Sequence, residues 1–234
     1  ASLSLNNSSY TPDYIAPAHL KRISYRYLSE SFSYRINTVD TKHFPNSGLL
    51  FQLSANTSSL ISGKINTESY KKTYTSEFPG DFLFKRSYAF TGGMRRYFSP
   101  GRKITLAAGW DLLFTDTKDS VTSPHNYYFA GGTSTSFSRS IPLTGFHPAE
   151  IAVERFASLN FDADLEFQEN LHISVMTNIA LAKEPDQTEG ITFLGGYGLG
   201  AGYMSIIGPI KVGFMHGLSS KKRYLNTLKG YISI

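Results

Sequence analysis

The sequence predicts an all-β protein, an antiparallel transmembrane β-barrel of outer-membrane type. First, apolar and polar side chains alternate over many segments, as in residues 156–168, which read FASLNFDADLEFQ. Every second residue from Leu159 to Phe167 is apolar, so a strand here has one apolar and one wet face. Second, short and long connections alternate along the chain. Third, the chain has 14% aromatic residues and 20 Gly, a composition that favours strands and turns over helices.

The alternation recurs along the whole chain. Leu49, Phe51 and Leu53, for example, oppose Gln52 and Ser54. About ten strands are predicted from this period of two, each with one continuous apolar face. Their approximate ranges are 2–9, 21–37, 48–59, 82–98, 103–115, 153–167, 170–183, 191–206, 209–218 and 223–234.

The connections between these strands form two classes. Short ones are predicted at 44–48, 99–101, 168–170 and 207–209, and long polar ones at about 10–20, 60–81 and 116–152. Short turns on one side and long loops on the other are typical of outer-membrane barrels. We therefore expect a single domain over residues 1–234, with the short turns facing the periplasm and long extracellular loops at about 60–81 and 116–152.

A soluble β-sandwich or lipocalin-like barrel would show the same alternation. Two features favour the bacterial outer membrane instead: the polar faces carry many small residues and Gly, and aromatic residues gather near strand ends. The apolar faces are then expected to contact outer-membrane lipid. Asp162, Asp164 and Glu166 are expected on a wet lumen wall, either paired with Arg or Lys or able to bind Ca²⁺.

Several classes of function are disfavoured. No apolar run reaches the roughly 18 residues that a membrane helix needs. The chain has no Cys, which excludes disulfides and thiolate sites, and its net charge of +5 is scattered, so nucleic acid is not an expected partner. No Gly-x-Ser-x-Gly elbow is present and the six His lack metal-ligand spacing, so no catalytic residue, metal or cofactor is expected. His172 and Ser174 share the lumen face but lack a third, orienting group in the sequence pattern.

Four glycines, Gly196, Gly198, Gly200 and Gly202, share one face of a predicted strand. Bare backbone in a strand marks either close approach of another segment or strong curvature, and both readings stay open. The centre of the long loop, Ile141-Pro142-Leu143-Thr144-Gly145-Phe146, is too apolar for a solvated tip. We therefore expect residues 130–150 to fold into the lumen near this glycine stripe, with Phe146 next to Gly200.

Three stretches resemble the bacterial surface antigen superfamily of outer-membrane assembly and translocation barrels. The last strands, FLGGYGLGAGYMSIIGPIKVGFMHGL, are similar to the Gly-rich strand and Gly-Pro turn near the end of that family's barrel. The segment INTVDTKHFPNSGLLFQLSA resembles a family hairpin with an Asp before a Phe-Pro turn. The segments NYYFAGG and IPLTGFHPAEI stand where the family has its long sixth extracellular loop.

The resemblance implies that Gly145 and Phe146 form the tip of an inward-folded loop. Thr144 stands where the family has an Arg that locks the loop to an acidic wall. Arg139 could replace it, with Asp162 or Asp164 as partner, or it is a solvated loop residue. The Ile-Pro-Leu-Thr-Gly-Phe form is more similar to barrels attached to patatin-like phospholipases. The family barrel is sixteen-stranded, so the chain forms either its C-terminal part or a reduced barrel.

Three functions follow as hypotheses. The first is protein translocation or membrane assembly, or anchoring of a patatin-like domain, with a client polypeptide, other outer-membrane subunits or a second copy in a homodimer as partners. The second is a passive pore or structural barrel. The third is an integral outer-membrane enzyme, which the missing catalytic motif disfavours.

Overall fold

The computed structural model describes residues 2–10, 20–69, 72–77, 86–116, 128–133, 139–185, 190–206, 208–220 and 228–233. Across these ranges, no helix has the length and apolar character needed to cross a membrane.

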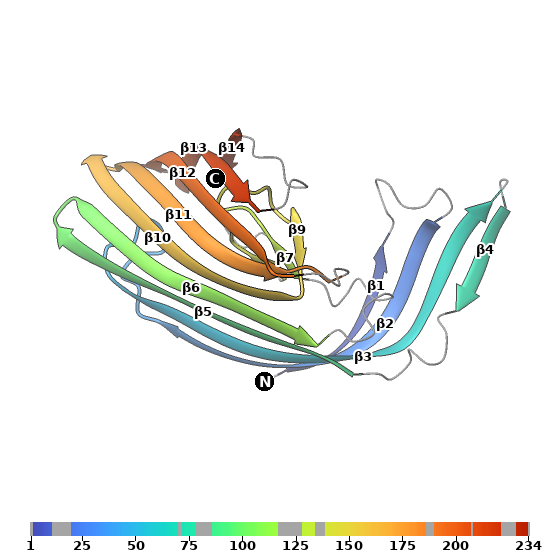
Figure 1. The fold of residues 1–234 in the computed structure, drawn as a ribbon. Helices are drawn as coiled ribbons and strands as arrows, with labels where there is room; N and C mark the ends of the chain where they lie inside the picture. Colours follow the sequence, from blue (N-terminus) through green and yellow to red (C-terminus); the bar gives the residue numbers. More distant parts are fainter. Residues whose placement is uncertain are drawn as a thin grey trace.

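One large antiparallel sheet dominates the described residues, and it is strongly curved (Figure 1). Ten strands follow one another in a continuous path. In order across the sheet they are β1 (Ser2–Tyr10), β2 (Leu20–Asn37), β3 (Gly48–Ser69), β5 (Arg86–Gly101), β6 (Ile104–Asp116), β10 (Arg155–Gln168), β11 (Leu171–Lys183), β12 (Thr192–Ser205), β13 (Gly208–Ser219) and β14 (Leu228–Ser233). The all-β, antiparallel fold class is confirmed, although β1 and β14 do not pair with each other within the described ranges.

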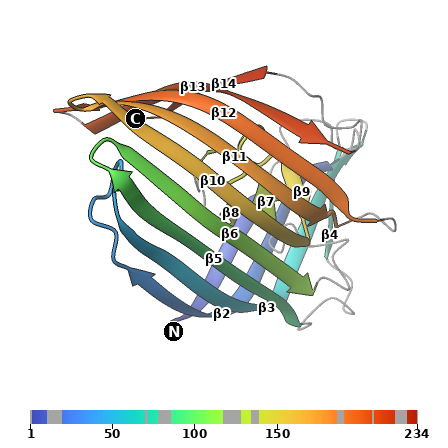
Figure 2. The ribbon, with the colours of Figure 1, turned by 60° about the vertical axis from the view of Figure 1, so that its left-hand side comes forward.

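A second, three-stranded sheet lies on the concave side of the large sheet (Figures 1 and 2). We call the space on this concave side the lumen. It consists of β7 (Tyr128–Ala130), β8 (Ser140–Ile141) and β9 (Ile151–Val153), with β7 in the middle. The expected long loop at 116–152 is therefore not irregular throughout. It forms strands because its alternating apolar residues, such as Ile141, Ile151 and Val153, are buried against the wall.

The two faces of the large sheet have opposite polarity. Large apolar side chains point outward, and they stay exposed in the isolated chain, Phe161 at 51% and Leu199 at 60%. Inward-facing Asn160 and Asn178 are buried at 5% and 3%. A soluble sandwich would bury the apolar face and expose the polar one. This inverted arrangement is that of an outer-membrane barrel, with the apolar face toward lipid.

The expected loop at 60–81 is wrong in its described part. β3 continues to Ser69, and its end pairs with the additional strand β4 (Lys72–Glu77). Backbone pairing does not need a lipid-facing side chain, and the residues at the start of β2 supply a partner for residues 63–67. β2 and β3 therefore extend beyond the outward-facing apolar residues from which we predicted the strand ends.

The first short turn is also longer than expected. The connection between β2 and β3 runs from Thr38 to Ser47. The expected turn at 99–101 is still part of β5, and the chain reverses at Arg102 and Lys103 instead. A register shift between Phe98 and Gly101 lets β5 continue through Pro100.

Two adjacent residues of β3 test the orientation of the sheet. Leu53 shares the outward face with Leu112, whereas Gln52 lies opposite Gly93 on the lumen face. We expect Leu53→Arg to destabilise the inserted protein by about 2–4 kcal/mol near the bilayer midplane, and less near an interface. Gln52→Arg should be nearly neutral, because its charge stays in the lumen. Folding titrations in lipid bilayers measure both, and equal tolerance at the two positions would contradict the lipid-facing assignment.

Candidate functional site in the lumen

The inward face of the wall becomes apolar where the loop of residues 139–150 packs on it; we call this segment the inward loop. The wall contributes Leu113, Phe156, Ala180, Ala182 and Leu194 to one buried cluster. The inward loop contributes Ile141, Leu143 and Phe146, of which Leu143 is fully buried. Each such side chain stabilises the packed state by about 1.5–3 kcal/mol. The sequence contained a signal for this contact, because Phe156 interrupts the polar face of β10.

Backbone hydrogen bonds hold the inward loop in one conformation. Gly132 N donates to Phe146 O at 2.9 Å, and Leu143 N donates to Gly132 O at 2.9 Å. Gly145 has a φ of +95°, a conformation that glycine adopts without strain. The tip of the loop is therefore built around Gly145.

The inward loop lies against one end of the glycine stripe. A Cβ atom at Gly196 would overlap Thr144 O, and one at Gly198 would lie 3.3 Å from Thr144 Cγ2. Gly145 approaches the wall in the same way at Gly217 of β13. At this end of the stripe, close approach of another segment is thus the reason for bare backbone.

The other end of the stripe receives different groups. The Tyr231 hydroxyl lies against Gly200, and the Phe44 ring lies against Gly202. The expected neighbour pair Phe146 and Gly200 is therefore wrong, because the Phe146 ring packs at Gly217 instead.

Arg139 does not replace the family's arginine lock. Its guanidinium carbon lies 5.9 Å from the centre of the Tyr128 ring. Its carbonyl accepts a hydrogen bond from Phe129 N, which fixes Arg139 at the edge of the small sheet. Asp162 instead pairs with Arg95 at 3.5 Å and Asp164 with His172 at 2.6 Å. The wall carboxylates already have partners on neighbouring strands.

A different ion pair ties the inward loop to the last strand. Lys229 of β14 donates to Glu150 Oε2 at 2.6 Å, and its side chain is only 5% exposed. Its Nζ also lies 5.2 Å from the centre of the Phe146 ring. Here the wall supplies the cation and the loop the carboxylate. Sequence reasoning missed this pair, although a Lys within a spanning strand was a signal for a buried partner.

The acidic residues of the wall belong to a paired polar surface. Besides the Asp162–Arg95 pair, Asp111 accepts a hydrogen bond from Asn160 Nδ2 at 2.8 Å. Glu166 is half-buried on the same face of β10. Within the described ranges, no three His, Asp or Glu side chains are grouped closely enough to hold a metal ion.

His172 has the orienting partner that the sequence pattern lacked, namely Asp164. The Phe44 ring covers His172, however, stacked at 3.8 Å between ring centres with an interplanar angle of 9°. The Ser174 hydroxyl instead lies with the Tyr231 hydroxyl beside Gly200. These contacts do not form a nucleophile activated by a base.

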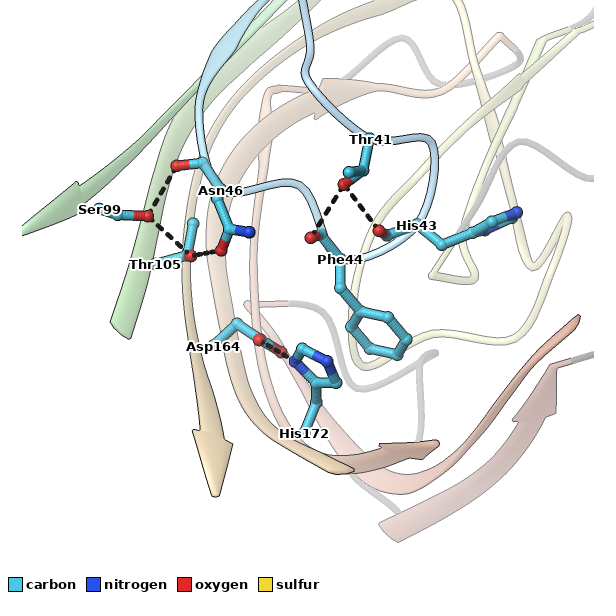
Figure 3. Close-up of polar contacts among 8 residues, drawn as sticks. All are labelled: Thr41, His43, Phe44, Asn46, Ser99, Thr105, Asp164 and His172. Atoms are coloured by element: carbon cyan, nitrogen blue, oxygen red, sulfur yellow. Dashed lines mark hydrogen bonds and ion pairs between the residues drawn. The ribbon is translucent and has the colours of Figure 1, made fainter. Parts of the chain in front are cut away.

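The segment of residues 38–47, which we call the crossing turn, is ordered by its own side chains. Asp40 Oδ1 accepts hydrogen bonds from Thr41 N at 2.9 Å and Asn46 N at 3.0 Å. The Thr41 hydroxyl donates to Phe44 O at 3.1 Å (Figure 3). Phe44 has a φ of +49°, which is uncommon for a bulky residue and points to a structural constraint at this position.

The Lys229–Glu150 pair predicts a specific loss of order. We expect Glu150→Gln to destabilise the docked loop by up to about 3 kcal/mol, since it leaves a buried cation without its carboxylate. The double variant Glu150→Gln with Lys229→Met should recover most of the loss. Hydrogen exchange at the Leu143 amide measures loop opening.

The matched control for that variant is Glu154→Gln. Glu154 pairs with Lys183 at 3.3 Å, but the Lys183 side chain is 36% exposed, so the loss should be about 0–1 kcal/mol. Equal effects of the two substitutions on Leu143 exchange would show that Lys229 does not hold the loop.

Asp40 predicts a pH dependence of the crossing turn. Burial raises the pKa of Asp40, but hydrogen bonds from the backbone N–H groups of Ser47, Asn46 and Thr41 together outweigh it and lower the pKa below its usual 3.8. The ionised carboxylate therefore stabilises the turn above about pH 4, and this contribution is lost as the pH falls through the lowered pKa. NMR titration of the carboxyl group and of the Asn46 amide measures it. Asp40→Asn should abolish the step, and a midpoint above 3.8 would contradict the geometry.

Comparison with known proteins places this arrangement in a family. A family model described as the OMP85 superfamily matches residues 18–232. A search of curated proteins found no match. The match covers nearly all of the sheet, the inward loop and the crossing turn, and it confirms the resemblance to surface-antigen barrels. The chain belongs to the OMP85 superfamily, and this membership implies a β-barrel protein of the bacterial outer membrane.

Proposed function

We propose that this chain forms the wall of a barrel that translocates a client polypeptide or assembles it into the outer membrane. The observation that carries the proposal is the docked inward loop. It packs inside the lumen, contacts bare backbone at Gly196 and Gly217, and is tied to the last strand by Glu150 and Lys229. Membership of the OMP85 superfamily supports the same class of function.

The inward loop lies where a client that passes through the lumen would contact it. Its apolar residues are buried against β6, β10, β11 and β12, and its Glu150 is bonded to β14. A change in the loop therefore acts on the wall and on the last strand together. A docked loop that is joined to both the wall and the last strand could couple a passing client to the wall, and this supports transport or assembly over the passive barrel.

The partners follow from the surfaces. Lipid covers the outward apolar face, and the polar wall around Asp162 offers a wet surface to an extended polypeptide. Association with other outer-membrane subunits or a second copy remains part of the proposal. Anchoring of a patatin-like domain rests only on the Ile-Pro-Leu-Thr-Gly-Phe stretch of the loop. An enzyme is not proposed, because Ser174 lies beside Tyr231 at Gly200 and His172 is stacked against Phe44.

Two adjacent glycines of β12 provide the test. Alanine at 196 would overlap Thr144 O and displace the inward loop. Alanine at 195 would meet neighbours only at 3.7 Å or more, so Gly195→Ala is the matched control. In a strain that lacks the gene, we expect the native protein and Gly195→Ala to restore client proteins that Gly196→Ala does not. Quantitative proteomics of the outer membrane and the medium measures the clients, with immunoblots to show equal amounts of each variant.

The same experiment separates the alternatives. An outer-membrane and secreted proteome unchanged by the deletion would reject translocation and assembly. Loss of small-solute uptake alone would indicate a passive pore. Loss of surface display of a patatin-like protein alone would indicate an anchor.

A further inference from the structure

The crossing turn reaches far beyond its own hairpin. It joins β2 and β3, yet Phe44 contacts residues of β11, β12 and β13. In the sheet, four strands separate β3 from β12, namely β5, β6, β10 and β11. The turn therefore crosses the concave side of the sheet from one wall to the other.

The far wall holds a seat for the Phe44 ring. His172, Gly202 and Lys211 are direct neighbours across β11, β12 and β13 and so form one row. The ring stacks on His172, and Lys211 Nζ lies 4.4 Å from the ring centre. Gly202 lies in the middle, where an added Cβ would be 2.5 Å from Phe44 Cζ. The bare backbone at Gly202 leaves the space that the ring fills.

The near wall holds the other end of the turn. Asn46 O accepts a hydrogen bond from the Ser99 hydroxyl at 2.8 Å, and Asn46 Oδ1 accepts one from Thr105 at 2.9 Å. Figure 3 shows Phe44 directed toward His172 while Asn46 is directed toward Ser99 and Thr105. The turn is thus fastened at both walls, on β5 and β6 through Asn46 and on β11 to β13 through Phe44.

The contact of Phe44 with the far wall is weaker than the docking of the inward loop. The loop buries several large apolar side chains, whereas the far end of the crossing turn has one ring on a polar row. Stacking and a cation over a ring are each weak interactions. An anchor of this kind can release and reseat without unfolding the wall.

We propose that the crossing turn is a gate across the end of the lumen at which the β2–β3 connection lies. The gate is closed when the Phe44 ring lies in the His172–Gly202–Lys211 row, and it opens when the ring leaves this row. This inference rests on the proposed function, because a client passing through the lumen requires this end to open. The inward loop packs on the wall at the other end of the lumen. The gate would explain why the Phe-Pro turn reaches across the lumen, a feature that the inward loop does not explain.

Conductance of the full-length protein in planar bilayers tests the gate. We expect Phe44→Ala to raise the fraction of time in the open state about tenfold, which corresponds to about 1.4 kcal/mol. Phe44→Tyr keeps a ring and should stay near the native value. His43→Ala is the matched control, since His43 lies in the same turn and points away from the seat (Figure 3). Heat-modifiable migration on gels shows that each variant is folded.

A second experiment changes the wall residue against which the Phe44 ring lies, and its readout does not depend on a current. Gly202→Val would fill the ring's space, and valine is compatible with a strand. The chain has no Cys, so a single Ser174→Cys reports access to the lumen beyond His172. We expect an impermeant thiol reagent to modify this cysteine about tenfold faster when Phe44→Ala or Gly202→Val is added, a change equivalent to about 1.4 kcal/mol.

The gate is overturned if Phe44→Ala and Gly202→Val leave both conductance and labelling unchanged, or if His43→Ala has the same effect as Phe44→Ala. Its failure differs from failure of the proposed function. An open Phe44→Ala channel with an unchanged proteome in the deletion strain keeps the gate and rejects translocation. Client loss in Gly196→Ala with no effect of Phe44→Ala keeps translocation and rejects the gate.

Discussion

The close approach of two backbones fixes the inside of this barrel wall. Thr144 and Gly145 of the inward loop lie against Gly196 and Gly217, at distances that admit no side chain. Only this approach brings Leu143 and Phe146 into the apolar part of the wall. It also brings Glu150 to Lys229, a cation that is too deeply buried to remain without a carboxylate. Packing and charge pairing in the lumen therefore both depend on missing Cβ atoms.

The lumen has three zones with different chemistry. At the loop end, a continuous apolar cluster joins the wall to the small sheet. In the middle, the wall is polar and internally paired, as at Arg95 and Asp162. At the turn end, one aromatic ring lies on a row of polar and bare positions. A tightly docked element and a weakly seated one thus face each other across a wet section.

The sequence predicted the features that follow from the alternation of apolar and polar residues, namely the strands and the direction of their side chains. Alternation placed Leu159 outward and Asp162 inward, and it located most strands within a few residues. It could not predict which distant segment covers a given inward position, because the pattern is local. Glu150 and Lys229 are 79 residues apart in sequence. Phe156, on the polar face of β10, did signal a covered position, but only the structure shows that the inward loop covers it.

The glycine stripe gains its meaning from what fills each position. Gly196 and Gly198 admit the inward loop, Gly200 admits Tyr231 of the last strand, and Gly202 admits Phe44 of the crossing turn. Three segments from separate parts of the chain therefore use one strand, β12, as their common support. A Cβ at Gly196, Gly200 or Gly202 would meet a different one of them. The stripe thus receives a different partner along its length, which curvature alone would not have required.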